Sequence, residues 1–552
     1  EIRIAAGTYT DVHVRPRRDV TTTGSVTQVV YLEKEVTLRG GYSADFGVWD
    51  PEQYPTTLDA QQQGRVVYIT GAISPVIEGV RLVHGRALDA FFSDGGGLYA
   101  ITASVTLLNN EVYSNAGIFG GGISLTRGNA YFNNNRVYDN YGGIGSGIRI
   151  EESDASLVEN SIMSNTAEYE GGGLRVSASH VYLSHNVISA NSAVGNGGGV
   201  YMAKSVATFL DNGIISNTVL GIPANSDSGN GGGVYASEAS ITLTENVLYA
   251  NYAGLSGGGI MAKEDSSITL SENDFISNVA EWMGGGVVLD DALAVLQGNA
   301  LVSNTATAAG ALLLIDSDLL SERNLIAFNS AEGDSGGGVA FILGSKGSFD
   351  GDKVIFNQTT RDGGGFLLSG LSVVTCTNVL IADNVALGRG EGIYVGSVNN
   401  KESLTLVHTT FANNGDKDGE GIFAEGSAVT VVLTNSIIAG HGVGISATAG
   451  SRVQLESTLW GSGAWANGLD WGGAGEIITG TPESNIWGDP GFMDPAAGNY
   501  HLRRDSIAID RGIDAGVLHD MDGQTRPLEG GYDLGADEFP PYWHYFPMVR
   551  RE

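Results

Sequence analysis

The chain has 552 residues and a formal net charge of −33, since 62 Asp and Glu residues stand against 29 Lys and Arg residues. This charge repels nucleic acid and anionic membrane surfaces, so neither is an expected partner, and it favours solubility and the binding of cations. No apolar run reaches the roughly 18 residues of a transmembrane helix, so membrane insertion is not expected. Cys376 is the single cysteine, which excludes an intrachain disulfide and fits a secreted bacterial protein.

Residues 1–90 are predicted to form the irregular first coils of a repeat protein. Residues 1–9 alternate like a strand from the first position, and the chain begins without Met. We therefore expect that a leader has been removed by processing, or that the sequence is a shortened form.

Residues 91–445 repeat with a period of about 26 residues, and most copies carry a glycine triplet and two asparagines five positions apart. The triplets begin at Gly95, Gly120, Gly171, Gly197, Gly231, Gly257, Gly284, Gly336 and Gly363. The asparagine pairs begin at Asn110, Asn135, Asn160, Asn186, Asn212, Asn246, Asn273, Asn299 and Asn324. A fixed period of this length is typical of a repeat architecture.

Within each repeat the apolar residues alternate at period two in three short runs, which indicates three strands per coil. The 82 glycines exclude helical repeats, because each glycine in a helix costs about 1 kcal/mol relative to alanine. We call each glycine triplet, or its degenerate copy such as Gly145-Ser146-Gly147, a glycine mark. The residue after each glycine mark is mostly aliphatic, as in Leu98, Ile123, Ile148 and Leu174. The sequence therefore predicts an all-β fold, a single parallel β-helix solenoid in which these residues stack inward in one column.

The repeated glycines and asparagines are predicted to have structural roles. Glycine permits positive φ and a sharp turn without a Cβ clash. Asparagine suits turns because its side chain bonds local backbone and tolerates left-handed conformations. Copies stacked ~4.8 Å apart can also bond one another as a ladder. The structural repeat residues singled out are Gly96, Gly121, Gly172, Asn115, Asn140 and Asn165.

Residues 446–540 are predicted to close the solenoid with further coils and a cap. Trp460, Trp465, Trp471 and Trp487 crowd into this region. Aromatic rings of this kind would suit a platform on which sugars stack. We favour the alternative that these large apolar groups cover the open end of the core.

Four aspartates in the same region form the one metal site that the sequence suggests. Residues 520–523 have the Asp-x-Asp-Gly start of a calcium loop, but no Glu stands at the twelfth position of an EF-hand. An acidic surface turn is the alternative. No cofactor is expected other than this calcium ion. The predicted calcium ligands are Asp520, Asp522, Asp533 and Asp537.

Residues 541–552 form an aromatic tail that is too apolar to lie comfortably in water. Open strand edges template pairing, and the first coil has no evident cap. We therefore expect head-to-tail self-association, in which the tail or last coil of one subunit covers the first coil of the next. The alternatives are a tail packed on its own coils and a sorting signal. The assembly residues are Tyr542, Trp543, Tyr545 and Phe546.

Several of these segments resemble known families. The glycine triplet followed by Ile, Leu or Val, and the Phe-x-x-Asn of residues 275–278 and 411–414, resemble the GGA[ILV] and FxxN repeats of chlamydial polymorphic outer membrane proteins. Most copies depart from the second element, with Val or Ile in place of Phe. Residues 1–9 and 485–538 resemble secreted bacterial right-handed β-helix proteins of the pectate-lyase-like superfamily, which implies right-handed coils and secretion. Residues 541–552 are similar to the terminal segments of secreted Chloroflexota proteins.

A polysaccharide lyase on this fold would need acidic calcium ligands and an Arg or Lys base on one strand face. Arg149 and Arg175 follow the glycine marks of adjacent coils, and Glu151, Glu152 and Asp154 lie close in sequence. Both arginines occupy outward positions of a regular repeat, so we expect them to be solvated surface charges. No catalytic residue is therefore predicted.

The regularity of the coils favours a secreted or cell-surface structural protein, either an adhesin or a subunit of an extracellular filament or sheath, without catalytic activity. Enzymes usually break local rules at their sites, and these repeats run on without such a break. The alternative is a carbohydrate-active β-helix enzyme, either a polysaccharide lyase or a glycoside hydrolase. The expected partners are other copies of the chain and a glycan, and neither nucleic acid nor a membrane.

Overall fold

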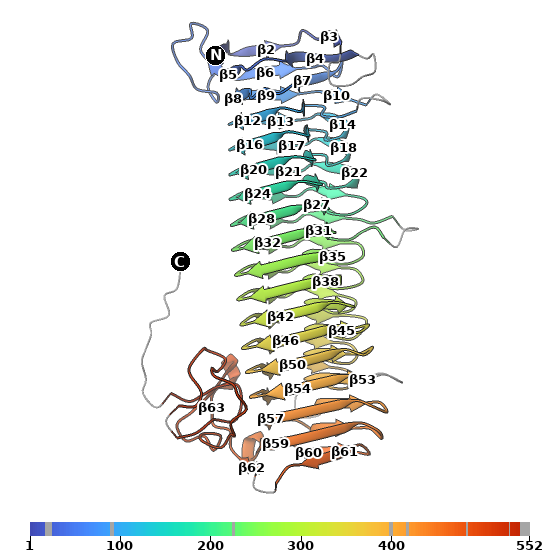
Figure 1. Cartoon of the computed structure of the whole chain (residues 1–552), viewed down its shortest axis with the longest axis vertical. Coiled ribbons are helices and arrows are strands. Elements are labelled where there is room, and N and C mark those ends of the chain that lie inside the picture. Colours follow the sequence, from blue (N-terminus) through green and yellow to red (C-terminus); the bar gives the residue numbers. More distant parts are fainter. Residues whose placement is uncertain are drawn as a thin grey trace. The chain divides into compact units, whose positions relative to one another are not determined.

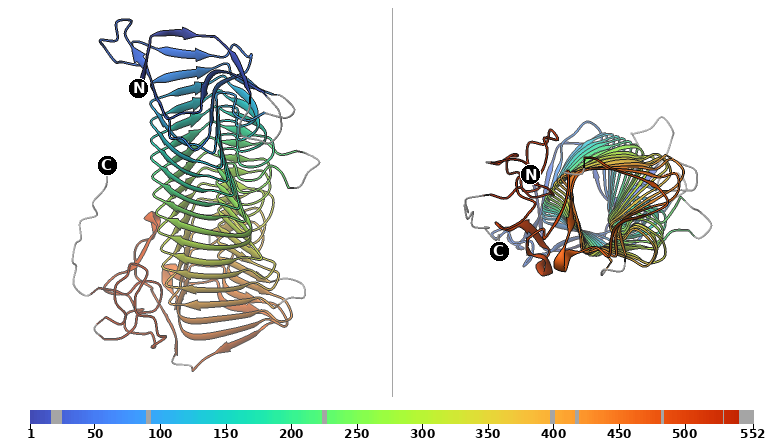
Figure 2. Two further views of the ribbon diagram at one scale, coloured as in Figure 1. Left: turned by 45° about the horizontal axis from the view of Figure 1, so that its top comes forward. Right: turned by 90° about the horizontal axis from the view of Figure 1, so that it is seen from below.

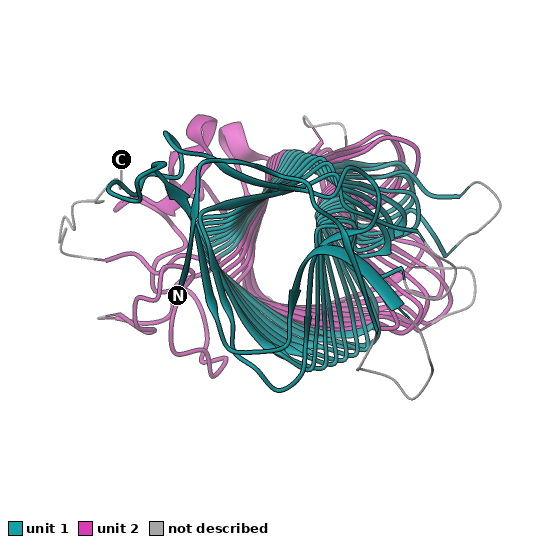
Figure 3. Cartoon of the chain, turned by 90° about the horizontal axis from the view of Figure 1, so that it is seen from above, with its two compact units in different colours: residues 1–295, 299–307, 311–313 teal, residues 296–298, 308–310, 314–552 magenta. Residues whose placement is uncertain are grey.

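The computed structural model describes residues 1–16, 25–88, 93–222, 227–396, 401–415, 419–481, 484–528 and 530–540. Strands dominate these residues, and 3₁₀ helices occur at Gly463–Trp465 and Pro495–Ala497. Among the described residues, no helix has both the length and the apolar composition that a membrane span requires. The chain divides into two compact units (Figure 3). Unit 1 comprises residues 1–295, 299–307 and 311–313, and unit 2 comprises residues 296–298, 308–310 and 314–552.

Unit 1 is a stack of coils whose strands pair in parallel with the equivalent strands of the next coil, in three rows that we call the first, second and third faces (Figures 1 and 2). The first face contains β4 (Ser25–Leu32), β7 (Arg65–Thr70), β11 (Leu98–Ile101), β15 (Ile123–Thr126), β19 (Ile148–Glu151), β23 (Leu174–Ser177), β27 (Val200–Ala203) and β31 (Val234–Ser237). The second face contains β1 (Ile2–Ala5), β5 (Thr37–Tyr42), β8 (Val76–Glu78), β12 (Ser104–Leu108), β16 (Asn129–Asn133), β20 (Asp154–Val158), β24 (His180–Ser184), β28 (Val206–Leu210) and β32 (Ser240–Thr244). The third face contains β2 (Gly7–Tyr9), β6 (Thr56–Asp59), β9 (Val80–Val83), β13 (Glu111–Tyr113), β17 (Arg136–Tyr138), β21 (Ser161–Met163), β25 (Val187–Ser189), β29 (Gly213–Ile215), β33 (Val247–Tyr249), β36 (Asp274–Ile276) and β39 (Ala300–Val302).

The remaining strands of unit 1 depart from this three-row scheme. Strands β35 (Ile260–Ser271) and β38 (Val287–Gln297) each run through the first and second faces, and the last two residues of β38 belong to unit 2. Strand β3 (His13–Pro16) pairs antiparallel with β4. A fourth row of short parallel strands lies at the corner before each glycine mark. It contains β10 (Arg86–Ala87), β14 (Ala116–Phe119), β18 (Tyr141–Ile144), β22 (Thr166–Glu170), β26 (Ser192–Ala193), β30 (Thr218–Val219), β34 (Tyr252–Ala253), β37 (Val279–Ala280) and β40 (Thr305–Ala306).

Unit 2 repeats the same coil. Its first face contains β45 (Val339–Ile342), β49 (Phe366–Leu368), β53 (Ile393–Gly396), β56 (Glu420–Glu425), β58 (Val443–Ala447) and β60 (Leu469–Gly473). Its second face contains β42 (Asp318–Glu322), β46 (Lys346–Asp350), β50 (Val373–Thr377), β54 (Ser403–Val407) and β61 (Glu476–Thr479). Its third face contains β43 (Leu325–Ala327), β47 (Lys353–Ile355), β51 (Leu380–Ala382), β55 (Thr410–Ala412) and β62 (Asn485–Gly488), while β57 (Thr430–Ala439) and β59 (Arg452–Gly461) span the second and third faces. The fourth row contains β44 (Ser330–Ala331), β48 (Gln358–Thr359) and β52 (Val385–Ala386), and β41 (Leu312–Ile315) has residues in both units.

The predicted fold class, an all-β parallel β-helix with three short strands per coil, is confirmed. Leu98 pairs with Ile123, Ile123 with Ile148, and Ile148 with Leu174, in an unbroken parallel register. All four side chains are buried in the core. The aliphatic column predicted from the repeat is therefore an inward column of the first face. The short fourth row was not predicted from the sequence.

The glycine triplet is explained by two different requirements, seen clearly at residues 120–122. Gly120 has φ +69°, a left-handed conformation that a side chain would strain. A Cβ on Gly121 would lie 2.3 Å from the carbonyl oxygen of Tyr141, and one on Gly122 would lie 2.6 Å from that of Gly147. The first glycine thus allows the turn, and the other two let backbone of the next coil approach.

The asparagines form two buried ladders along each stack. In unit 1, Asn110 donates from its backbone N–H and from Nδ2 to Oδ1 of Asn135, both at 3.0 Å. Its Nδ2 also donates to the carbonyl oxygen of Ile77 in the preceding coil. Asn115 and Asn140 are linked in the same way in the second ladder. Each pair of asparagines in a ladder thus supplies hydrogen-bond partners to buried N–H, amide and carbonyl groups, whose burial without partners would destabilise the fold.

The left-handed turn beside each ladder uses the residue before the asparagine. Asn134 has φ +52° and precedes Asn135, and Asp139 has φ +53° and precedes Asn140. The ladder asparagine is therefore held by its side-chain bonds, and the residue ahead of it adopts the left-handed conformation that the sequence analysis assigned to asparagine.

In unit 2, Asp352 replaces asparagine in the first ladder. Its Oδ1 accepts hydrogen bonds from the backbone N–H and Nδ2 of Asn324 and from the hydroxyl of Ser321, and its Oδ2 accepts from the N–H of Asp350. The side chain is fully buried, and burial raises the pKa of Asp352 to about 7. The carboxyl thus occupies a place built for a neutral amide.

We predict that Asp352→Asn stabilises the protein at neutral pH. In the unfolded chain this carboxyl ionises near its ordinary pKa of 3.8, whereas in the fold it holds its proton up to about pH 7. Between these values the folded state binds more protons, so the wild type loses stability as pH rises. The gain in unfolding free energy of the variant over the wild type should grow from pH 4 to 7, by up to about 4 kcal/mol. Urea unfolding of the wild type and the variant between pH 4 and 7 tests this prediction. A difference in unfolding free energy that does not vary with pH would contradict it.

Candidate functional site

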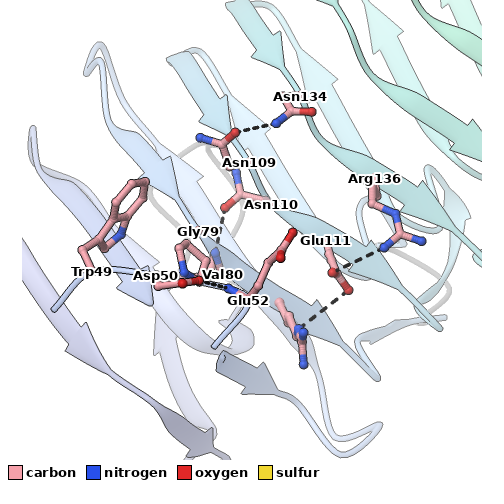
Figure 4. A pocket seen from close by; sticks show the side chains of 12 residues that line it. Trp49, Asp50, Glu52, Gly79, Val80, Asn109, Asn110, Glu111, Asn134 and Arg136 are labelled. Atoms are coloured by element: carbon pink, nitrogen blue, oxygen red, sulfur yellow. Dashed lines mark hydrogen bonds and ion pairs between the residues drawn. The ribbon is translucent and has the colours of Figure 1, made fainter. Parts of the chain in front are cut away.

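An open cleft of about 480 Å³ lies in unit 1 at the corner between the second and third faces (Figure 4). A loop between β5 and β6 carries Trp49 and Glu52 to one side of it, and strands β9, β13 and β17 form the other side. We call this the Trp49 cleft. Its lining residues are Trp49, Asp50, Pro51, Glu52, Gly79, Val80, Arg81, Asn109, Asn110, Glu111, Asn134 and Arg136.

A row of alternating charges crosses the cleft because the strands pair in register. Arg81 pairs with Glu111, and Glu111 pairs with Arg136, at the same outward position of β9, β13 and β17. Nε of Arg81 lies 3.7 Å from Oε2 of Glu111, and Nη1 of Arg136 lies 3.6 Å from Oε1. The hydroxyl of Tyr138 donates to Oε2 of Glu111 at 3.2 Å. The Glu111 carboxylate is therefore shared between two guanidinium groups and a phenol.

The environment of Tyr138 strengthens this arrangement. Its ring stacks on that of Tyr113 with centroids 4.8 Å apart, and the guanidinium of Arg136 lies 5.2 Å from its centroid. Burial, together with the nearby Glu111 carboxylate, raises the pKa of Tyr138 to about 12. The phenol thus acts as a hydrogen-bond donor at neutral pH and does not act as a base.

Trp49 supplies an aromatic wall on the opposite side of the cleft. Its Nε1 donates to the carbonyl oxygen of Gly40 at 2.9 Å, and the guanidinium of Arg39 lies 4.1 Å from its ring centroid. Arg39 is in turn fixed by Glu78, with Nε 2.9 Å from Oε2. The residue as a whole is 38% exposed. These contacts hold an accessible indole in one orientation.

The polar groups between these two sides are amides and carboxylates. Nδ2 of Asn134 donates to Oδ1 of Asn109 at 2.7 Å, and both lie at the rim (Figure 4). Oδ1 of Asp50 accepts the N–H groups of Glu52 and Gln53 and so fixes the loop. Glu52 itself is exposed. An aromatic ring with donors and acceptors on both sides is suited to a hydroxyl-rich ligand.

The expectation that Arg149 and Arg175 are solvated surface charges is wrong. Arg149 is 7% exposed, and its guanidinium bonds Asp94 at 3.1 Å, pairs with Glu151, and lies 5.1 Å from the ring centroid of Phe119. Arg175 is half-buried, with Nε 3.2 Å from Oε2 of Glu170. The outward positions of the first face are covered here by residues from the fourth row, including Phe119 on β14 and Glu170 on β22.

The four tryptophans of the C-terminal region occupy three environments. Trp460 is fully buried, and its ring lies 5.1 Å from that of Trp471 inside the last coils. Trp465 packs edge-on against Phe492, in a cluster outside the coils. Trp487 is 51% exposed and donates from Nε1 to Asp470. The four rings do not form one platform.

The residues after β62 fold back along the side of unit 2 and do not extend its stack (Figure 1). Tyr500 donates to Asp383 at 2.7 Å, the N–H of Ala536 donates to the hydroxyl of Thr410, and the Arg526–Glu538 ion pair is fully buried within the segment. This lateral segment covers outward alanines of the third face, such as Ala382 and Ala412. Residues 446–540 were predicted to form closing coils and a cap, and in the structure the residues after β62 lie along the side of unit 2 instead.

The predicted calcium ligands separate into two groups. Oδ1 of Asp520 accepts the N–H groups of Asp522 and Gln524, and Asp533 accepts those of Asp510 and Phe539, so both carboxylates hold the local backbone. Asp522 and Asp537 instead come together with His501, which the sequence analysis did not consider. The assembly residues Tyr542, Trp543, Tyr545 and Phe546 lie outside the described residues.

We predict that Arg149→Ala lowers the free energy of unfolding by about 2–3 kcal/mol, because it removes a buried cation from beside Asp94 and Glu151. The matched control is Arg452→Ala, which removes a guanidinium that is 54% exposed and 3.8 Å from Glu476. The control should cost under about 1 kcal/mol. Urea unfolding of the two variants measures the difference, and equal costs would contradict the buried role of Arg149.

Comparison with known proteins agrees with the observed coils. None of the curated proteins compared with the chain matches it. The family described as "Right handed beta helix region" matches residues 67–248 and 258–459, which is more than half of the chain. These residues include most of the glycine triplets and most members of both asparagine ladders of unit 1, while Asn251 and Gly257 lie between the two matched segments. The chain therefore belongs to the right-handed β-helix family.

Proposed function

We propose that this protein is a secreted or cell-surface β-helix protein of the adhesin or extracellular structural type, that it has no catalytic activity, and that the Trp49 cleft binds a carbohydrate chain. The observation that carries the proposal is the composition of the cleft. Its accessible indole stands opposite a fixed row of Arg81, Glu111 and Arg136. Stacking on the ring and hydrogen bonds to these groups are the two interactions that sugar recognition uses.

The carboxylates of the cleft support binding over bond cleavage. A glycosidase needs one carboxylic acid in an apolar environment that keeps it protonated, and a second carboxylate opposite it. Glu111 is shared by Arg81 and Arg136, Asp50 holds its own loop, and Glu52 is exposed. None of the three has the apolar surroundings of a general acid.

The burial of Arg149 on the first face argues against the alternative that the protein is a polysaccharide lyase. A lyase base must reach a proton on the substrate. Arg149 is buried and engaged with Asp94, Ser124 and Glu151, so its guanidinium is not presented to a ligand. The interactions of Arg149 are those of a structural residue.

Self-association remains part of this proposal. Head-to-tail contacts through the last coil or residues 541–552 would join subunits into a filament, since a heterologous contact of this kind does not close. An adhesive or sheath role would use the repeated coils as a spacer between such contacts.

We predict that the protein retains a polysaccharide ligand but releases no product from it. Binding to a panel of neutral and acidic polysaccharides can be followed by affinity electrophoresis of the full chain. Trp49→Ala should weaken binding to the selected polysaccharide by about 5- to 30-fold, since loss of a stacking ring costs about 1–2 kcal/mol. Reducing ends and unsaturated uronates are assayed in the same mixtures.

The matched control is Trp282→Ala, which removes another exposed tryptophan of unit 1 outside the cleft. It should leave binding unchanged. Release of reducing ends or unsaturated product would instead establish the carbohydrate-active enzyme. Equal binding by Trp49→Ala and the wild type would overturn the assignment of the cleft.

A further inference from the structure

A histidine and two aspartates meet where the lateral segment of unit 2 folds back on itself. His501 lies on β64 (Asn499–Leu502), Asp522 in the turn at residues 520–523, and Asp537 near the end of the described segment. One nitrogen of His501 and one carboxylate oxygen from each aspartate lie within 4.8 Å of one another. The three come from separate parts of the segment, whose other strand is β63 (Phe492–Asp494).

His501 is oriented as a metal-binding histidine is. Its Nδ1 lies 2.6 Å from Oδ1 of Asn499, and this same oxygen accepts the N–H of His501. The amide oxygen of Asn499 and the carboxylate oxygen of Asp522 both only accept, so both ring nitrogens carry protons when no metal ion is bound, and a metal ion would take the place of the proton on Nε2. Nε2 points at Oδ2 of Asp522, 2.6 Å away. A second hydrogen bond that fixes the ring in this way is a regular feature of histidine ligands.

Asp537 supplies an independent indication of a missing partner. Its side chain is 2% exposed, and its Oδ2 accepts the N–H of Leu502 at 2.7 Å. Its Oδ1 is buried without a hydrogen-bond partner among the described residues. A buried carboxylate oxygen without a donor is costly, and a cation beside it would remove that cost.

We propose that His501, Asp522 and Asp537 bind a divalent transition-metal ion of the Zn²⁺ or Co²⁺ type, with solvent as the fourth ligand. One imidazole and two carboxylates form a mixed nitrogen and oxygen donor set that such ions accept, whereas Ca²⁺ takes six to eight oxygens. His501 and Asp522 are 30% and 35% exposed, which leaves an entry path and room for the solvent ligand.

The ion would act as a clamp. It would join the turn at residues 520–523 to β64 and to the end of the lateral segment, which cover the third face of unit 2. Lys353 of β47 lies 4.0 Å from Oδ1 of Asp522 and is 34% exposed, so its ammonium can move into solvent when the ion enters. The site differs from the sequence-based calcium prediction, since Asp520 and Asp533 are replaced by His501.

Titration of the metal-depleted full chain with Co²⁺ tests this site, because tetrahedral Co²⁺ has visible absorption bands. One equivalent should bind and should be displaced by one equivalent of Zn²⁺, and Zn²⁺ should raise Tm. Asp537→Asn and His501→Gln should each weaken Co²⁺ binding about 10- to 100-fold or more. Asp537→Asn keeps the shape of the buried side chain, so folding and binding can be separated by circular dichroism.

His180→Gln is the matched control, because His180 is an exposed histidine with Nδ1 3.1 Å from Asp154 but lacks a second carboxylate. It should leave Co²⁺ binding unchanged. Absence of saturable Co²⁺ binding, or full binding by folded Asp537→Asn, would overturn the proposal. Binding of Ca²⁺ in preference to Co²⁺ would overturn the assigned class of metal. None of these outcomes bears on the carbohydrate assay of the Trp49 cleft.

Discussion

Parallel stacking brings every residue against its own equivalent in the next coil, and this constraint decides which residues each column can contain. An apolar column is satisfied by any aliphatic side chain, as Leu98 and Ile123 show. A buried polar column is stable only if the repeated group is both donor and acceptor to its copies. The asparagine side chain meets this requirement. In one ladder, the Nδ2 of Asn110 donates and the Oδ1 of Asn135 accepts.

Each ladder also contains a residue other than asparagine. Asp352 ends the first ladder of unit 2 with a carboxyl group, which has no amide N–H to donate to a next copy, and burial raises its pKa to about 7. In the second ladder, His441 accepts from Nδ2 of Asn414 through its Nε2, and burial lowers the pKa of His441 to about 4. Both replacements lie in unit 2, whose third face is covered by the lateral segment. Regularity thus declines in the part of the chain that packs against non-repeating structure.

The features predicted correctly from the sequence are those that recur from repeat to repeat. Three local patterns recur in the repeats: apolar alternation at period two, the glycine marks and the paired asparagines. Because the coils stack in register, equivalent residues of successive repeats form the columns and ladders. The short fourth row was missed because strands of two to five residues, such as β26, carry too few positions to show a pattern. Arg149 was placed at the surface because nothing in its own coil predicts Phe119 above it or Asp94 beside it, 55 residues away. The Trp49 cleft and the grouping of His501 with Asp537 depend on irregular loops, whose paths have no period to follow.

Hydrogen exchange measured by mass spectrometry tests most directly whether the buried ladder holds the coils together. Asn160 links the coil of Asn135 to that of Asn186. Asn160→Ala removes the side-chain hydrogen bonds of both ladder steps and leaves only the backbone N–H bond to Asn186. Exchange should accelerate in residues 129–189 and stay slow in the coils of unit 2, whereas Ala in place of the exposed Asn129 should change neither. Unchanged protection of residues 129–189 in Asn160→Ala would show that the aliphatic columns alone maintain the stack, and would contradict this account.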